Sequence, residues 1–190
     1  MGSLGSEHLF SLNAEGGPLL CLDAAASSCW RGAEDGAADY GNLCAEIDAR
    51  PDFSAAILPL PGGPGVVWEM AGAGTADVFL RPDGSLIAMR AWLSEESAEE
   101  LDRLVGAAAS SRQELGDLAV PSGAIAVLWA PESGKSVPQG IGGLWQTVPG
   151  TALDESAFVV KAPYGHYSCL DEFVQVGEAS ARRLTLVPRR

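Results

Sequence analysis

The chain has 190 residues, of which 47% are hydrophobic and 19% are charged. This composition excludes a disordered chain, because it supplies enough apolar side chains to build a core. The formal net charge of −13 argues against direct nucleic-acid binding, since a negative field repels phosphate backbones. No apolar run approaches the ~20 residues of a transmembrane helix, so no membrane partner is expected.

Residues 1–6 are rich in Gly and Ser and lack the positive flank and apolar stretch of a signal peptide. We expect them to be a flexible N-terminus or a remnant of expression cloning. They precede one expected domain, residues 7–190, with a candidate subdomain boundary near residues 116–123. The predicted location is the cytoplasm, and the oligomeric state stays open.

The excess of acid lies entirely in the first two-thirds of the chain. Residues 1–120 hold 6 Lys and Arg against 19 Asp and Glu, whereas residues 121–190 hold six of each kind. The simplest interpretation is a surface that keeps the protein in solution. The alternative is a field that attracts a basic partner.

Short apolar runs separated by turn signals predict mostly antiparallel strands. The expected strands cover residues 9–12, 19–22, 53–60, 66–70, 78–80, 86–93, 124–130, 157–162, 167–176 and 182–187. Residues 23–38 are expected to form a loop, residues 116–123 a linker and residues 131–149 a long irregular loop. Asp39 is expected to cap a short helix that runs to Ile47.

The strongest local pattern runs from Ala76 to Ser110. Gly84 suits a tight hairpin turn, and one face of the return strand carries Ile87, Met89, Ala91 and Leu93. Ser94 is expected to cap a long amphipathic helix whose Leu101 and Leu104 pack on that face. The predicted fold class is α+β, with mostly antiparallel sheets, one long amphipathic helix and one short helix.

Two glycine-rich motifs fail as nucleotide sites. Gly134-Lys135-Ser136 ends like a phosphate-binding loop, but Trp129 occupies the position of the first glycine. Gly72-Ala73-Gly74 lacks the third glycine of a dinucleotide fingerprint, since that position holds Asp77. The four cysteines contain no Cys-x-x-Cys pair, which favours reduced thiols over a zinc site. We therefore expect no cofactor and no metal.

His166 is the one candidate for acid–base chemistry. It lies in the segment Pro163-Tyr164-Gly165-His166-Tyr167, upstream of Asp171 and Glu172. A His–carboxylate pair serves as a general base in many enzymes, which keeps a small hydrolase or transferase as an alternative. No nucleophile motif accompanies it, so we expect no catalytic residues. A subunit of a larger bacterial assembly is the third alternative.

Two clusters of residues resemble the bacterial immunity protein 21 family. The first contains Glu15-Gly16-Gly17-Pro18-Leu19-Leu20, Trp30-Arg31-Gly32, Asp39-Tyr40 and Cys44, and the second is the segment 163–167 followed by a final apolar strand. The resemblance covers residues 12–188, although the middle of the chain departs from the pattern. It implies a non-enzymatic protein that binds and neutralises a cognate polymorphic toxin. Gly16, Gly17 and Pro18 are expected to be structural.

The expected partner is therefore a toxin domain with a basic surface, which an acidic inhibitor approaches with electrostatic acceleration. Loop tryptophans are typical interface anchors, and acids near them supply the field. The predicted partner-binding residues are Trp30, Glu34, Asp35, Asp48, Asp52 and Trp145. The toxin itself and its activity stay open.

Overall fold

The computed structural model describes residues 5–70, 72–94, 97–137 and 157–189, which form two β-sheets and three short α-helices. Sheet A contains, in spatial order, β1 (Glu7–Ala14), β5 (Gly74–Leu80), β6 (Leu86–Trp92), β11 (Ala179–Pro188), β10 (Gly165–Val176) and β7 (Ser111–Val120). Sheet B contains β3 (Ala55–Leu60), β4 (Gly63–Glu69), β2 (Pro18–Asp23), β8 (Ala124–Trp129) and β9 (Ala157–Lys161). All pairings between these strands are antiparallel.

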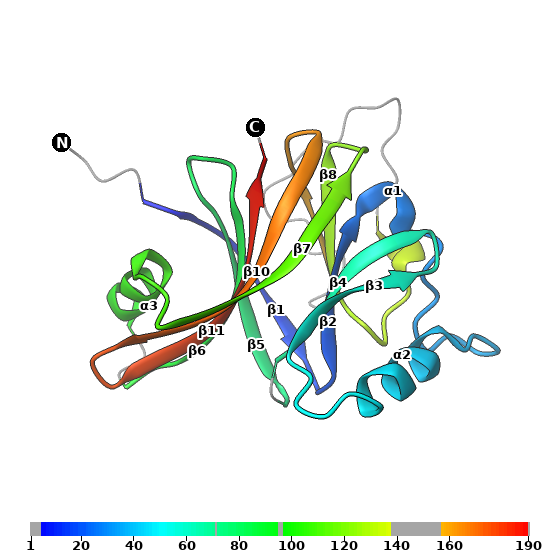
Figure 1. The fold of residues 1–190 in the computed structure, drawn as a ribbon, viewed down its shortest axis with the longest axis horizontal. Helices are drawn as coiled ribbons and strands as arrows, with labels where there is room; N and C mark the ends of the chain where they lie inside the picture. Colours follow the sequence, from blue (N-terminus) through cyan, green and yellow to red (C-terminus); the bar gives the residue numbers. More distant parts are fainter. Residues whose placement is uncertain (1–4, 71, 95–96, 138–156, 190) are drawn as a thin grey trace.

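The two sheets pack face to face, and helices cover their outer faces (Figure 1). Strand β2 shows the layering most clearly, because all six of its residues are buried. Leu19 and Cys21 point into the core between the sheets, whereas Leu20 and Leu22 point to the outer side of sheet B. This alternation follows from the two-residue period of a strand. Because both faces of β2 are buried, residues 19–22 are all apolar.

The outer face of sheet B is covered by α1 (Ala24–Ser27), α2 (Asp39–Asp48) and the 3₁₀ turn η1 (Gly134–Ser136). The outer face of sheet A is covered by α3 (Ala98–Gly106). Helices α2 and α3 therefore lie at opposite ends of the molecule (Figure 1). Within the part of the chain that the structure describes, no helix has the length and apolar character to cross a membrane.

The structure confirms the predicted antiparallel sheets and the short helix at residues 39–48. The prediction of a long amphipathic helix was wrong. Helix α3 has nine residues and starts after Ser97, whose side chain accepts a hydrogen bond from the Glu100 backbone. Ser97 and Glu100 have the spacing of a capping box, which displaces the expected cap at Ser94. Ser94 instead donates its hydroxyl to the Glu100 carboxylate at 2.6 Å.

The end of α3 is set by an arginine from sheet A. Arg183 donates to the backbone oxygens of Leu104, Val105 and Ala107 at 3.1–3.2 Å, and these are carbonyls that a helix end leaves without partners. The chain turns away after Gly106 and enters β7. A long-range contact of this kind leaves no trace in local periodicity.

The predicted linker at residues 116–123 was also wrong, whereas the candidate subdomain boundary there stays a prediction. Strand β7 runs through residue 120 and pairs with β10. Gly116 sits where the register of this pair shifts and has φ +109°, so it marks a β-bulge rather than a flexible segment. The expected loop at 23–38 likewise begins with α1, and most of the loop predicted at 131–149 lies outside the described residues.

The hairpin of β5 and β6 is confirmed, but it is buried on both faces. Ile87 and Met89 contact the helix layer, while Leu86 and Ala88 belong to the core between the sheets. The sequence pattern assigned this strand one apolar face, that of Ile87 and Met89. Leu86 and Ala88 on the other face pack toward sheet B.

We expect Leu104→Ala to lower the free energy of unfolding by ~2–5 kcal/mol, the range for truncating a buried leucine. Leu104 is fully buried and packs in the cluster of Ile87 and Met89. Leu101→Ala is the matched control, because Leu101 lies on the same helix but is only half-buried, and its loss is expected to be about 1 kcal/mol. Urea unfolding measures both, and equal losses would contradict this placement of the helix.

Candidate functional site

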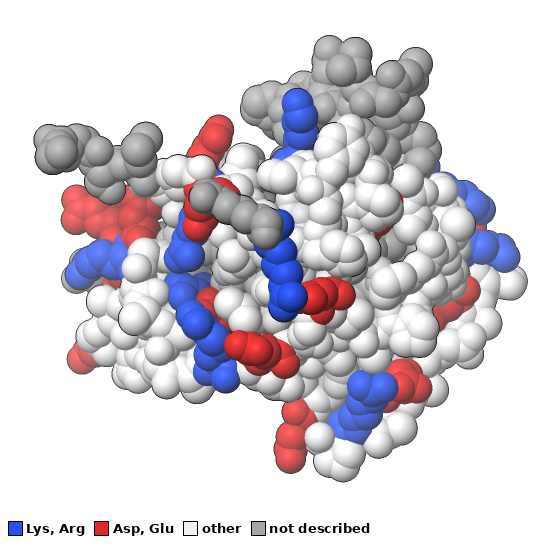
Figure 2. All heavy atoms as spheres, turned by 45° about the horizontal axis from the view of Figure 1, so that its top comes forward, with Lys and Arg blue, Asp and Glu red and all other residues white. Residues whose placement is uncertain are grey.

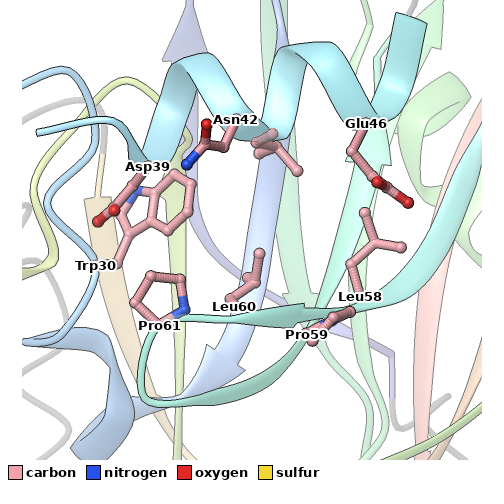
Figure 3. Close-up of a pocket in the computed structure, with 9 residues that line it drawn as sticks. Trp30, Asp39, Asn42, Glu46, Leu58, Pro59, Leu60 and Pro61 are labelled. Atoms are coloured by element: carbon pink, nitrogen blue, oxygen red, sulfur yellow. The ribbon is translucent and has the colours of Figure 1, made fainter. Parts of the chain in front are cut away.

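An apolar groove with a volume of about 280 Å³ runs between α2 and the β3–β4 hairpin. Figure 3 shows the helix along one side and the end of the hairpin along the other. The groove is lined by Trp30, Asp39, Asn42, Leu43, Glu46, Leu58, Pro59, Leu60 and Pro61. Leu43 and Leu58 form its buried floor, whereas Pro59 and Pro61 are exposed. Apolar surface therefore stays open to a partner.

The groove exists because α2 is only partly seated on sheet B. Leu43 is its one buried residue, and Tyr40 and Ile47 pack at half burial. The far wall is fixed at the β3–β4 turn, where Gly62 has φ +90° and lies against the Ala26 carbonyl. An added Cβ at Gly62 would meet that oxygen at 2.6 Å, so only glycine allows the turn to approach α1 so closely.

The loop before α2 forms a rigid end wall. Trp30 donates its indole N–H to the Ala130 carbonyl at 2.9 Å. Gly32 has φ +57°, and a Cβ there would meet the Pro131 carbonyl at 2.2 Å. The Asp39 carboxylate accepts the Arg31 backbone N–H at 2.8 Å, so Asp39 ties this loop to the helix while Ala38 occupies the cap position. The residues of the first resemblance cluster thus serve the local structure.

Residues 31–52 hold six carboxylates, Glu34, Asp35, Asp39, Glu46, Asp48 and Asp52, of which Asp39 and Glu46 line the groove. With Arg31 and Arg50 from the same range, and Lys135, which pairs with Glu34, the net charge is −3. The face shown in Figure 2 mixes acidic and basic side chains, with wide uncharged areas between them.

Glu34 differs from its acidic neighbours because its charge is balanced locally. Its carboxylate lies 2.8 Å from the Lys135 ammonium and 3.6 Å from the Arg31 guanidinium. The hydrogen bond from Lys135 is the main cause that lowers the pKa of Glu34 to about 2. Glu34 is thus ionised at neutral pH, and its ion pair with Lys135 links the loop before α2 to η1.

The other predicted partner-binding residues divide into three groups. Asp35 and Asp48 are exposed, as a partner contact requires. Asp52 is exposed too, but its φ of +60° makes it a turn residue, in a conformation that Asp tolerates better than most side chains. Trp30 is 1% exposed and forms a wall of the groove, so its ring does not project from the surface, and its role in partner binding stays a prediction. Trp145 lies outside the described residues.

The structure does not bring His166 together with Asp171 or Glu172. All three lie on β10, and His166 and Asp171 are five positions apart, about 16 Å along a strand, on opposite faces. Asp171 accepts hydrogen bonds from Ser54, Trp68 and Arg182 at 2.7–3.3 Å. It thereby joins the two sheets across one edge of the core.

Glu172 performs a similar structural role on the other face of β10. It accepts hydrogen bonds from Arg183, Thr185 and Arg112 at 2.7–2.9 Å. Burial on its own raises the pKa of this carboxyl, but the three hydrogen bonds outweigh it and hold the pKa below the ordinary value of 4.5. An open depression of about 290 Å³ lies here, and Arg112 and Arg182 on its lining are already paired with these two carboxylates.

The described residues contain no group of three His, Cys, Asp or Glu side chains placed to hold a metal ion. Cys21 and Cys169 are buried thiols whose pKa is raised by burial, that of Cys169 to about 12. Lys135 of the Gly134-Lys135-Ser136 motif is engaged with Glu34 on the surface.

Of the nine residues that line the groove, sequence reasoning named only Trp30 as partner-binding and missed the other eight. The apolar run at residues 53–60 correctly indicated a strand, but nothing in its pattern shows which side chains a neighbouring helix leaves uncovered. Comparisons with protein-family models, with curated proteins and with solved structures find no match to this chain.

Proposed function

We propose that this protein is a non-enzymatic immunity protein that binds a cognate bacterial toxin domain and neutralises it. The observation that carries the proposal is an open apolar groove set in an acid-rich surface between α2 and the β3–β4 hairpin. Protein interfaces combine an apolar centre with a polar rim, and the acidic rim here favours a basic partner.

The geometry gives an enzymatic function less support. The two carboxylates predicted to act with His166, Asp171 and Glu172, form ion pairs with Arg182 and Arg183. His166 is exposed at the start of β10, where its backbone carbonyl accepts the Arg189 N–H. A catalytic base needs an orienting partner within hydrogen-bond reach, and these carboxylates lie about 16–20 Å from the histidine along the strand.

Co-expression tests the proposal directly. Genes adjacent to the one that encodes this chain would be expressed alone and together with it in a heterologous host. We expect one of them to encode a toxin that stops growth alone and is harmless in the presence of this protein. A toxic neighbour that remains equally toxic when this protein is present in excess would contradict the proposal.

Salt and charge are expected to act on the association rate of that complex. Raising the ionic strength from 0.1 M to 1 M shortens the Debye length from ~10 Å to ~3 Å and should slow association markedly, with little change in dissociation. The double variant Asp35→Asn, Asp48→Asn should slow association at low salt. The matched control is Glu99→Gln, Asp102→Asn on α3, which removes two exposed charges at the other end of the molecule.

Stopped-flow kinetics separates these expectations from a general solubility role. If the acids serve only solubility, association is nearly independent of salt. Equal slowing by the α2 and α3 variants would show that the net charge acts without regard to place. Either result would contradict steering by the surface around the groove.

A further inference from the structure

The lining of the α2 groove is unusual in its charge. Among its nine residues there are two carboxylates, Asp39 and Glu46, and no Lys or Arg. The two acids lie seven positions apart on α2, about 10 Å along the helix axis. They stand at opposite ends of the groove, with Leu58, Pro59 and Leu60 of β3 between them (Figure 3).

We propose that this groove receives a short segment of the toxin in which one apolar side chain lies between two cationic ones. The inference rests on the proposed function and specifies the chemistry of the contact. The apolar side chain would lie on Leu43, Leu58 and Leu60, and the two cations would reach Asp39 and Glu46. Charge complementarity selects this occupant, because an acidic or neutral segment gains nothing from the rim.

The volume of the groove suits a side-chain ligand. About 280 Å³ lies just below the usual range of small-molecule pockets and is enough for one large apolar side chain with parts of its neighbours. Part of the apolar lining is in contact with water, since Leu60 is half-buried and Pro59 and Pro61 are exposed. An apolar group that covers them removes further surface from water.

Both carboxylates retain capacity for a partner's cations. Asp39 uses one oxygen, Oδ2, to accept the Arg31 backbone N–H, and a carboxylate accepts several hydrogen bonds. Glu46 pairs with Arg50, four positions along the helix, and both side chains are about half exposed to solvent. Such an exposed pair is weak, so an incoming cation with the apolar group beside it can replace Arg50.

The test is an NMR titration of the full chain, with methyl and amide signals assigned. The probe is the tripeptide Arg-Leu-Arg, acetylated and amidated at its ends. We expect the methyl signals of Leu43, Leu58 and Leu60 to shift together and to saturate. Arg-Ser-Arg should bind roughly tenfold more weakly, because it lacks the apolar group, and Glu-Leu-Glu should cause no saturable shift.

Two variants with the same change of charge locate the contact. Glu46→Gln should weaken Arg-Leu-Arg binding by roughly threefold or more, because an ion pair at the rim is lost. Glu99→Gln, on an exposed position of α3 at the other end of the molecule, should leave the affinity unchanged. Equal affinity for Arg-Leu-Arg and Arg-Ser-Arg, or shifts that avoid the three leucines, would overturn the inference.

Failure of the inference is distinguishable from failure of the proposed function. If co-expression protects the host and the peptide does not enter the groove, the toxin uses another surface, and only the inference about the groove is contradicted. If the peptide binds as expected and no neighbouring toxin is neutralised, the groove remains a site for a basic segment, and the proposed immunity function is contradicted.

Discussion

Arg183→Leu is expected to lower the free energy of unfolding by ~3–5 kcal/mol, the cost of breaking a buried ion pair from one side. Arg183 is 3% exposed and donates to Glu172 at 2.7 Å and to three carbonyls at the end of α3. The variant leaves a buried carboxylate without its main counter-charge and removes three hydrogen bonds from the helix end, where Arg81 still donates to the Val105 carbonyl. Chemical denaturation followed by circular dichroism measures the loss.

Arg112→Leu is the matched control, because Arg112 also binds Glu172. Its side chain is 55% exposed, and an ion pair in contact with solvent contributes ~1 kcal/mol or less. The two variants remove the same residue type from the same carboxylate and differ in burial. Equal losses would show that burial of the Arg183–Glu172 pair does not determine its contribution.

The same pair predicts an acid-sensitive stability. The pKa of Glu172 in the folded protein is lower than its ordinary value of 4.5, so the unfolded chain binds a proton more readily than the folded one. The stabilisation is therefore complete above about pH 4.5 and is lost as the pH falls through the folded pKa. Glu172→Gln should unfold more easily at neutral pH and show a flatter decline of stability below pH 4.5. An unchanged acid slope would contradict this role of Glu172.

Trp30→Ala is expected to lower the free energy of unfolding by ~3–5 kcal/mol. The indole is 1% exposed, packs with Leu43 and Leu58 in the layer outside sheet B, and donates to the Ala130 carbonyl. Its removal takes away the end wall of the groove and the anchor of the loop before α2. Partner binding should fall with it, because the groove loses its shape.

Trp92→Ala provides the comparison for that variant. Trp92 is 39% exposed at the end of β6, and the Arg90 guanidinium lies 5.3 Å from its ring centroid. Its loss is expected to cost about 1 kcal/mol, in line with an exposed cation–π contact and partial burial. If Trp92→Ala costs as much as Trp30→Ala, the placement of Trp30 as a core residue is contradicted.

Local signals were sufficient for most of the strands and for the hairpins. The turn at Gly84, the reversal between β3 and β4 and the periodicity of residues 86–93 are properties of neighbouring residues, and the structure confirms them. What local signals could not predict depends on contacts distant in sequence. Arg183 ends α3 from 76–79 residues away, and β10 captures residues 111–120 as a strand.

The site shows the same limit. His166, Asp171 and Glu172 are close in sequence, which suggested a His–carboxylate general base. All three lie on one extended strand, which separates the histidine from both acids. The sequence placed Trp30 in a loop and therefore predicted a contact with a partner. In the structure this loop folds inward, and the Trp30 indole N–H donates to the Ala130 carbonyl. The groove itself arises from incomplete coverage of sheet B by α2, a tertiary property that no single stretch of sequence encodes.

The most direct test of the proposed function uses the purified protein and the purified toxin domain encoded beside it. Toxin activity would be measured while this protein is added at increasing molar ratio. The proposed function predicts that activity falls linearly and is abolished near one equivalent, with a stable complex recovered by gel filtration. Full toxin activity in the presence of excess protein, or inhibition without any complex, would contradict it.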